Sequence, residues 1–131
     1  MDHQATILIV DDEPDVITFL QRALESEGFA VIPAYDGLAA LDIAEADQPD
    51  LILLDIMMPM MSGYDVCRQL KSNPQTKTIP VICVTSAQSA DTRHKARDAG
   101  AQALLIKPFT AQELIAQVRR YLGSDATSES S

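Results

Sequence analysis

Basic residues, cysteines and long apolar runs are all scarce in this sequence. Its 131 residues hold 10 Lys and Arg against 19 Asp and Glu, which gives a net charge of −9. Binding to a nucleic-acid backbone needs clustered basic side chains, so this balance argues against it. No apolar run approaches the ~18 residues that span a bilayer, and residues 1–10 lack the pattern of a signal peptide. We therefore expect a cytoplasmic protein without membrane insertion or direct nucleic-acid binding.

Motifs for thiol chemistry and nucleotide binding are also missing. Cys67 and Cys83 are far apart and form no C-x-x-C pair, so we interpret both as reduced packing residues. The sequence contains no G-x-x-x-x-G-K-[ST] loop, and the segment DDEPD at 11–15 would repel phosphate without a metal. These absences argue against a flavodoxin-like nucleotide carrier.

The sequence does contain a regular alternation of short apolar segments and longer amphipathic ones. Hydrophobic residues make up 47% and charged residues 22%, which is typical of one globular domain at this length. The predicted strands are the apolar segments 6–10, 30–34, 51–54, 79–84 and 103–106. The predicted helices lie at 14–27, 37–47, 63–72, 89–99 and 111–122. This alternation predicts an α/β fold, with a parallel sheet covered by helices on both faces.

Polar residues mark the starts of several predicted helices. Asp36 is placed to cap one helix, while Ser62 with Asp65 and Thr110 with Glu113 are capping-box patterns. The predicted inward faces are Val16, Phe19, Leu20, Ala23 and Leu24 in the first helix and Leu114, Ile115, Val118 and Leu122 in the last. The helix at 89–99 has only alanines on its apolar side, namely Ala90, Ala96 and Ala99. We interpret that helix as a mobile element.

Four predicted strands end in polar residues. The ends of the first, third, fourth and fifth strands are Asp11-Asp12-Glu13, Asp55, Thr85-Ser86 and Lys107-Pro108. Each alone has an ordinary explanation, such as a helix cap or a solvated loop. Because functional groups of parallel sheets gather at the carboxyl ends of the strands, we expect these groups to lie together. Three adjacent carboxylates repel one another unless a cation intervenes, and a set of oxygen ligands suits Mg²⁺.

The other two groups extend this site toward phosphoryl chemistry. Lys107 offers a positive charge for an anionic group, and the Thr85 hydroxyl can donate a hydrogen bond to it. With a metal present, Asp55 could then act as the nucleophile that accepts a phosphoryl group. A carboxylate beside a core is costly unless it is paired. We expect Mg²⁺ and Lys107 to be the partners that make Asp55 tolerable there.

At this point the sequence resembles the receiver domain of two-component response regulators, in the manner of the single-domain chemotaxis response regulator. The resemblance covers residues 5 to 122, and the matching segments are ILIVDDEPD (7–15), DLILLDIMMPMMSGYD (50–65), PVICVTSAQ (80–88) and LLIKPF (104–109). It implies a flavodoxin-like doubly wound fold with a five-stranded parallel sheet in the order 2-1-3-4-5. It also implies a receiver domain at 5–123, followed at 124–131 by a polar tail that is disordered or begins a linker.

The resemblance assigns roles to individual residues. Asp55 is expected to be the phosphoacceptor, and Mg²⁺ is expected to bind Asp11, Asp12, Asp55 and the backbone carbonyl of Met57. Thr85 and Lys107 would bind the phosphoryl group, and the Lys107–Pro108 peptide bond is expected to be cis.

The resemblance also implies partners and a switching mechanism. A histidine kinase or phosphotransfer protein would supply the phosphoryl group, and the signal would pass to an unidentified downstream protein. The face made by helix 89–99, strand 103–106 and helix 111–122 is expected to change on phosphorylation. The protein would catalyse its own phosphorylation and dephosphorylation as a switch, not as a metabolic enzyme, and would be a monomer or weak dimer.

Several positions depart from the family pattern. Leu104 replaces an aromatic switch residue, and Gln102-Ala103 and Gln117 replace the charged residues of a common dimer interface. Met57 and Ala87, two residues after Asp55 and Thr85, are apolar, and neither can position a hydrolytic water. We therefore hypothesise slow self-dephosphorylation.

Two alternatives bear on this interpretation. An aspartyl-phosphate hydrolase would need a second acid two residues after Asp55, where Met57 stands. A receiver-like interaction module that never takes phosphate remains possible from the sequence. The methionines Met57, Met58, Met60 and Met61 are interpreted as core or loop filling instead of a soft-metal site, and His94 as solvated instead of a phosphodonor.

Overall fold

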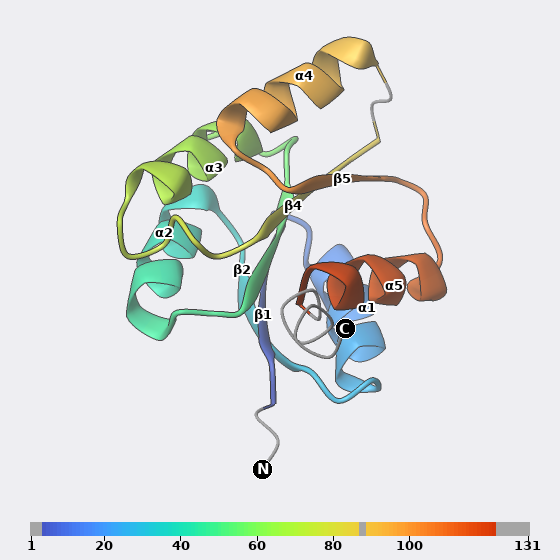
Figure 1. Cartoon of the computed structure of the whole chain (residues 1–131). Helices are drawn as coiled ribbons and strands as arrows, with labels where there is room; N and C mark the ends of the chain where they lie inside the picture. The colour runs from blue at the N-terminus through green and yellow to red at the C-terminus, as the bar shows by residue number, and fades with distance from the viewer. Residues whose placement is uncertain (1–3, 87–88, 123–131) are drawn as a thin grey trace, which may run out of the picture.

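The computed structural model describes residues 4–86 and 89–122. Within these residues, five parallel strands form one sheet in the order β2-β1-β3-β4-β5, as the sequence predicted (Figure 1). The strands are β1 (Thr6–Val10), β2 (Ala30–Ala34), β3 (Leu51–Asp55), β4 (Val81–Thr85) and β5 (Ala103–Ile106). The helices are α1 (Pro14–Glu25), α2 (Gly37–Asp47), α3 (Gly63–Ser72), α4 (Ala90–Ala99) and α5 (Ala111–Leu122). The predicted α/β doubly wound fold is confirmed.

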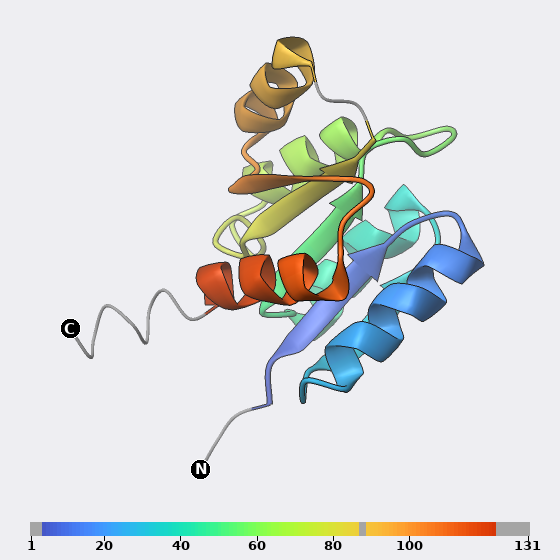
Figure 2. The ribbon, with the colours of Figure 1, turned by 90° about the vertical axis from the view of Figure 1, so that its right-hand side faces the viewer.

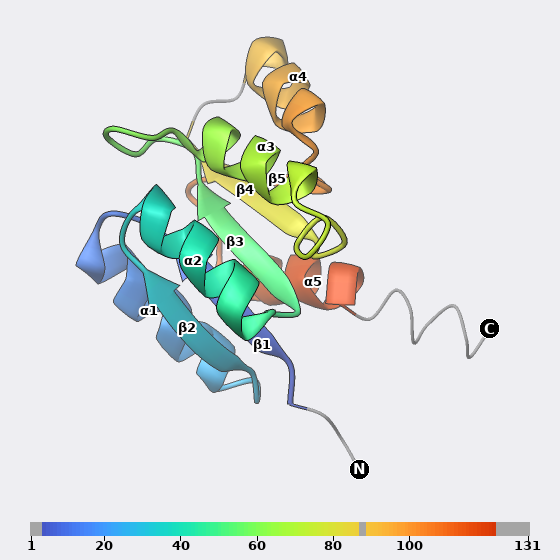
Figure 3. The same ribbon diagram turned by 90° about the vertical axis from the view of Figure 1, so that its left-hand side faces the viewer.

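Helices cover both faces of the sheet. Helices α1 and α5 lie on one face and α2, α3 and α4 on the other, as Figures 2 and 3 show from opposite sides. Successive side chains of a strand point to opposite faces, so Ile7 and Ile9 join the core under α1 and α5, while Leu8 and Val10 join the core under the other three helices. This two-sided burial explains why the central strands are almost wholly apolar.

Two predicted helix caps form as the sequence indicated. The side chain of Asp36 accepts a hydrogen bond from the amide of Ala39 at 2.8 Å, at the start of α2. At the start of α5, the amide of Thr110 donates to Glu113 Oε1 at 2.8 Å, and the amide of Glu113 donates to Thr110 Oγ1 at 3.0 Å. This reciprocal pair is a complete capping box.

The third predicted cap, at the start of α3, forms only one of its two bonds. Ser62 Oγ accepts from the amide of Asp65 at 3.3 Å. The Asp65 carboxylate accepts from Arg68 at 2.9 Å instead of returning to the chain before the helix. The ion pair with Arg68 therefore replaces half of the box.

The inward face of α1 differs from the prediction at one position. Phe19 was expected to face the core, but its side chain is 50% exposed, and Ile17 is buried instead. Ile17, Leu20 and Leu24 follow the spacing of three and four residues that keeps side chains on one helix face. Phe19 lies off that stripe, so the prediction for it was wrong.

The smaller differences lie in α4 and at the ends of elements. Thr92 is buried together with two of the predicted alanines of α4, whereas Ala90 is exposed. Helix α1 ends at Glu25, before Gly28, which adopts a φ of +93°. Strand β3 extends to include Asp55, and β4 runs from Val81 to Thr85.

Strands β2 and β5 form the two edges of the sheet. In β2, the amide of Ala30 donates to Ala5 in the chain entering β1, and the carbonyl of Ala34 accepts from the amide of Asp11. Because alternate residues of a strand point their backbone groups to opposite sides, Pro33 directs its backbone nitrogen away from β1.

Both cysteines behave as predicted, since Cys67 and Cys83 are buried free thiols in the core under α2, α3 and α4. No helix in the described part of the chain is both long and apolar enough to cross a membrane. The predicted tail at 124–131 and the position of Ala87 lie outside the described residues.

Candidate functional site

Three carboxylates meet at the carboxyl end of the central strands. Asp11 and Asp12 follow β1, and Asp55 ends the adjacent strand β3. One carboxylate oxygen from each residue lies within 4.8 Å of those of the other two. Asp11 and Asp55 are buried, whereas Asp12 is exposed. The sequence therefore identified a real cluster, because β1 and β3 are neighbours and end together.

The Asp11 side chain is held from two directions. Its Oδ1 accepts from the amide of Glu13 at 2.9 Å, and its Oδ2 lies 3.7 Å from Lys107 Nζ. Lys107 is fixed in turn by its amide, which donates to the carbonyl of Thr85 at 2.8 Å. The Lys107–Pro108 peptide bond is cis, as expected from the family resemblance. The ion pair of Lys107 is thus made with Asp11, beside Asp55.

The Asp55 carboxyl has an unusual environment for an acid. It is 5% exposed, and the amide of Met57 donates to its Oδ1 at 3.2 Å. Burial raises the pKa of Asp55 to about 6, and the charge of Asp11 adds to this effect; Lys107 and the Met57 amide lower it, and Asp12 raises it slightly. Ionised Asp55 is therefore energetically unfavourable in the absence of a further positive charge.

A small cavity of about 190 Å³ opens at this cluster. Its walls are formed by Asp12, Glu13, Asp55, Met57, Ser86 and Lys107. Thr85 is buried at the end of β4, in the strand beside Asp55. The structure thus brings Asp11, Asp12, Asp55 and Lys107 together, with Thr85 at the adjacent strand end.

The donor set at this cavity fits a hard divalent cation. All three acidic side chains offer oxygen, and the group includes no histidine or cysteine. Mg²⁺ is usually bound by one or two carboxylates together with water and phosphate oxygens. Asp11, Asp12 and Asp55 would hold it, and the backbone carbonyl of Met57 stays a predicted further ligand.

Gly63 is a residue of this site that the sequence analysis did not single out. A Cβ atom at Gly63 would collide with the carbonyl oxygen of Asp55 and would lie 2.6 Å from the Cα of Ile56. The amide of Gly63 also donates to the carbonyl of Ile56 at 2.9 Å. The start of α3 therefore packs directly against the backbone of the candidate phosphoacceptor. The signal was the glycine after Ser62, which the capping pattern alone did not explain.

Two residues that depart from the family pattern, Gln102 and Leu104, make structural contacts away from the acidic cluster. Gln102 Oε1 accepts from the amide of Val81 at 2.8 Å, so this glutamine ties the turn before β5 to the start of β4. Leu104 is partly buried against the core under α2, α3 and α4. Neither residue takes part in the acidic cluster.

A comparison with known protein families agrees with the sheet order and with the acidic cluster at the carboxyl ends of the central strands. The family model for the response regulator receiver domain matches residues 7–119. The chain therefore belongs to the response regulator receiver domain family of two-component systems.

Individual relatives have the same character. The chain is 42% identical to the response regulator MprA of Mycobacterium avium over 116 residues. The aligned region covers 88% of this chain and 50% of that protein. The MprA protein of Mycobacterium tuberculosis is 41% identical over 116 residues, with the same coverage. The chain spans about half the length of the curated relatives it matches.

Solved structures with a similar fold are also receiver domains or response regulators. The chemotaxis protein CheY4 of Vibrio cholerae has a TM-score of 0.88 at 29% identity, covering 92% of this chain and 100% of that one. A putative response regulator from Chloroflexus aurantiacus has a TM-score of 0.88 at 33% identity, covering 92% and 99%. The receiver domain of sensor histidine kinase PA1611 from Pseudomonas aeruginosa has a TM-score of 0.85 at 30% identity, covering 92% and 99%. That structure has a magnesium ion coordinated in its active site cleft.

Proposed function

We propose that this receiver domain is a phosphorylation-dependent switch whose phosphoacceptor is Asp55. The observation that supports this most directly is the cluster of three carboxylate oxygens within 4.8 Å, with Lys107 in contact with Asp11. The working unit is residues 5–123, and residues 124–131 are a polar tail or the start of a linker. A histidine kinase or phosphotransfer protein supplies the phosphoryl group, and the exchange takes place in the cytoplasm.

The reaction is a transfer from a phosphohistidine nitrogen to a carboxylate oxygen. An oxygen of Asp55 attacks phosphorus, the new O–P bond forms, and the P–N bond breaks with its electron pair going to the histidine. Lys107 Nζ lies 3.7 Å from Asp11 Oδ2, which places the ammonium group at the site before the reaction. There it balances the charge of the phosphoryl oxygens. The Thr85 hydroxyl, at the adjacent strand end, donates to one of those oxygens.

The carboxylates prepare the site for a metal. Burial, and after it the charge of Asp11, raises the pKa of Asp55 to about 6, so ionising this carboxyl costs more here than in solution. Asp11, Asp12 and Asp55 would hold Mg²⁺, which would supply positive charge that favours the ionised form of Asp55 and offsets the charge of the transferring phosphoryl group. Asp12 is the exposed member of the three and gives the cluster its opening to solvent.

The signal leaves through the face of α4, β5 and α5. The amide of Lys107 donates to the carbonyl of Thr85, so the ends of β4 and β5 are joined beside the phosphoacceptor. A new dianionic group on Asp55 draws Thr85 and Lys107 toward it and shifts a two-state equilibrium of this face. An unidentified downstream protein reads the change.

Intact-mass spectrometry after incubation with acetyl phosphate tests the proposal. We expect one phosphoryl group to be gained with Mg²⁺, none without it, and none in the Asp55→Asn variant under either condition. No gain in the wild-type protein, despite a folded circular dichroism spectrum, would instead favour a phosphate-independent interaction module. A gain in Asp55→Asn would assign the phosphoacceptor to another residue.

A further inference from the structure

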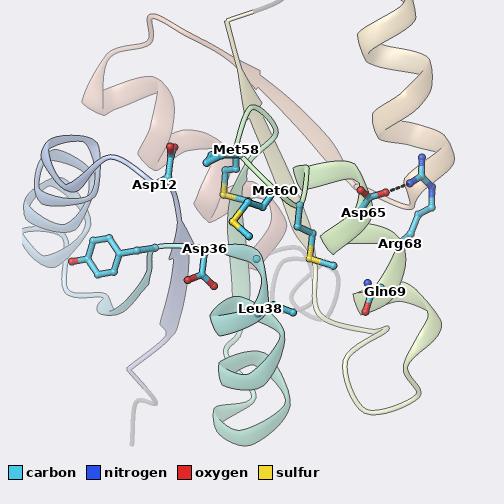
Figure 4. Close-up of a pocket in the computed structure, with 12 residues that line it drawn as sticks. Asp12, Asp36, Leu38, Met58, Met60, Asp65, Arg68 and Gln69 are labelled. Atoms are coloured by element: carbon cyan, nitrogen blue, oxygen red, sulfur yellow. Dashed lines mark hydrogen bonds and ion pairs between the residues drawn. The ribbon is translucent and has the colours of Figure 1, made fainter.

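A second and larger cavity lies beside the phosphoacceptor site, between the β3–α3 loop and the start of α2. Its volume is about 760 Å³, within the range of roughly 300 to 1,000 Å³ typical of binding pockets. Figure 4 shows side chains from three separate segments converging on it. The apolar part of the wall is formed by Tyr35, Leu38, Met58, Met60 and Met61.

Several of these apolar side chains are exposed to solvent. Leu38 is 69% exposed, Met60 is fully exposed, and Tyr35 is half exposed. Met60 also adopts a φ of +72°, a left-handed conformation that non-glycine residues rarely take. Contiguous exposed apolar surface on a protein is characteristic of a recognition site.

The floor of the cavity is firmly built. Met61 is partly buried, and its Sδ would lie only 2.8 Å from a Cβ atom at Gly37, so the loop and the first turn of α2 are in close contact. Met58 is buried in the core under α2, α3 and α4. The exposed side chains therefore project from a loop that is packed against α2 and the core.

Acidic groups surround this apolar surface. Asp12, Asp36 and Asp65 all line the cavity, and Figure 4 shows them arranged around the methionines. Arg68 is the basic residue among the lining groups, and it donates to Asp65 at 2.9 Å. An adjoining cavity of about 600 Å³ shares Leu38 and Arg68 and adds further acidic residues of α2, namely Asp42 and Glu45. Together the two cavities, called here the α2–α3 groove, have an apolar centre and a negative border.

The charge of the groove decides between possible occupants. A second copy of the chain would bring an identical acidic border to this one, in a protein whose net charge is −9. The segment 123–131 carries Asp125 and Glu129 and has no large apolar side chain. Both are therefore poorly suited to a surface that is apolar at its centre and negative at its border.

We propose that the α2–α3 groove binds an amphipathic helix of a partner protein, with apolar side chains on one face and Lys or Arg beside them. Helix-in-groove recognition uses apolar anchors spaced three, four and seven residues apart. The unbranched thioethers of Met60 and Met61 adapt to such anchors, while Asp36, Asp42 and Glu45 attract the flanking cations. Neither Leu38 nor Met60 belongs to the phosphoacceptor site, so the proposal stands independently of phosphorylation.

Methionine-methyl NMR on the whole chain tests this binding directly. The probe is a helical peptide of about four turns, with leucines on one face and lysines beside them; the control peptide has serine in place of each leucine. We expect the methyl signals of Met58, Met60 and Met61 to shift most on titration with the leucine peptide. Met57 lines the small cavity at Asp55 instead and provides an internal reference.

Two matched variants separate the groove from general surface attraction. Leu38→Ser removes an exposed leucine from the groove, and Phe19→Ser removes a comparably exposed apolar residue from α1. We expect Leu38→Ser to weaken peptide binding about tenfold, as loss of a central apolar anchor does, and Phe19→Ser to leave it unchanged. Equal binding of the serine peptide, equal loss in both variants, or absence of methyl shifts would overturn the proposal. Shifts that depend on protein concentration without peptide would assign the groove to a second copy.

Discussion

At the scale of single residues, the ionised form of Asp55 destabilises the fold that carries it. The pKa of this carboxyl is about 6 in the folded protein, against an ordinary value of 3.8, because of burial and the neighbouring Asp11. The folded state therefore binds the proton more tightly, and the stability that this provides below the ordinary pKa is lost as the pH rises toward 6. We expect Asp55→Asn, in Mg²⁺-free buffer at about pH 8, to raise the free energy of unfolding by up to about 3 kcal/mol, since each pKa unit corresponds to about 1.4 kcal/mol.

Urea unfolding of both proteins at several pH values measures this effect. At about pH 4 the wild-type carboxyl is largely protonated, so the difference from Asp55→Asn should disappear. A difference that stays constant between the two pH values would show that the charge of Asp55 is not its cause. Asp98→Asn, which removes an exposed carboxylate of α4, is a suitable control and should show no such pH dependence.

Because of Met57, we expect phosphorylated Asp55 to lose its phosphoryl group slowly. The side chain of Met57 is 69% exposed at the rim of the small cavity, where a thioether cannot orient an attacking water. Met57→Asn supplies an amide at this rim and should shorten the lifetime of the acyl phosphate severalfold. The lifetime is measured by the decay of the phosphorylated mass after removal of acetyl phosphate, with Met60→Asn as the control. An unchanged lifetime in Met57→Asn would contradict the hypothesis.

The identities of the site residues followed from the sequence more readily than their contacts did. The order of strands and helices alone placed Asp11, Asp12 and Asp55 together at the carboxyl ends of the strands, because neighbouring parallel strands end at the same side of the sheet. The ion pair of Lys107 with Asp11 and the approach of Gly63 to Asp55 depend on loop conformation. Loop conformation is determined by tertiary packing, which a one-dimensional pattern does not contain.

At the scale of helices and strands, α2 and α3 begin with glycines that differ in what surrounds them. A Cβ at Gly63 would meet the backbone of Asp55 and Ile56, whereas a Cβ at Gly37 would meet the side chains of Met61 and Val66. Backbone atoms cannot move aside as side chains do, so we expect Gly63→Ala to cost about 2 kcal/mol of stability. Gly37→Ala should cost less than about 1 kcal/mol, since alanine also favours the helix.

Thermal unfolding and phosphorylation by acetyl phosphate distinguish the two glycines. Because Gly63 packs on the backbone of Asp55, the proposed phosphoacceptor, its alanine variant should also be phosphorylated more slowly. The Gly37 variant should keep the wild-type rate. Equal effects of the two substitutions on both measurements would contradict the special role of Gly63.

Helix α4 is anchored to the core by small side chains only. Its buried residues are Thr92, Ala96 and Ala99, whereas α1 buries Ile17, Leu20 and Leu24. We therefore expect the protected amides of α4 to exchange with deuterium at least about tenfold faster than those of α1, a difference of about 1.4 kcal/mol in opening free energy. Mass spectrometry of peptic fragments measures this rate. Protection of α4 equal to that of α1 would contradict its predicted mobility.

Most helix and strand boundaries could be predicted because local chemistry determines them. Asp36 and the pair of Thr110 and Glu113 cap their helices through bonds between neighbours in the sequence. Phe19 was predicted wrongly because two overlapping apolar stripes can be drawn on α1, and only contact with the sheet selects between them. The ion pair that draws Asp65 away from the α3 cap likewise depends on a rotamer choice that the sequence leaves open.

At the scale of the whole molecule, the proposed binding of Mg²⁺ by the acidic cluster would stabilise the folded state. A ligand that binds only the folded state stabilises it by RT ln(1 + [L]/Kd), about 1.4 kcal/mol at ten times the Kd. We expect MgCl₂ to raise the melting temperature of the wild-type chain more than NaCl at matched ionic strength. Asp12→Asn removes an exposed ligand of the cluster and should lose this difference, whereas Asp98→Asn should retain it. An equal response of wild type and Asp12→Asn would remove Asp12 from the metal site.

The orientation of Pro33 in the edge strand β2 has a consequence for the behaviour of many molecules together. An uncovered strand edge offers a row of amide donors on which another chain can add and start an aggregate. The backbone nitrogen of Pro33 faces that open side and carries no hydrogen. A chain that pairs with β2 therefore lacks one hydrogen-bond donor, at the fourth residue of the strand. Pro33 therefore leaves the open edge of β2 with one amide donor fewer for the addition of a further strand.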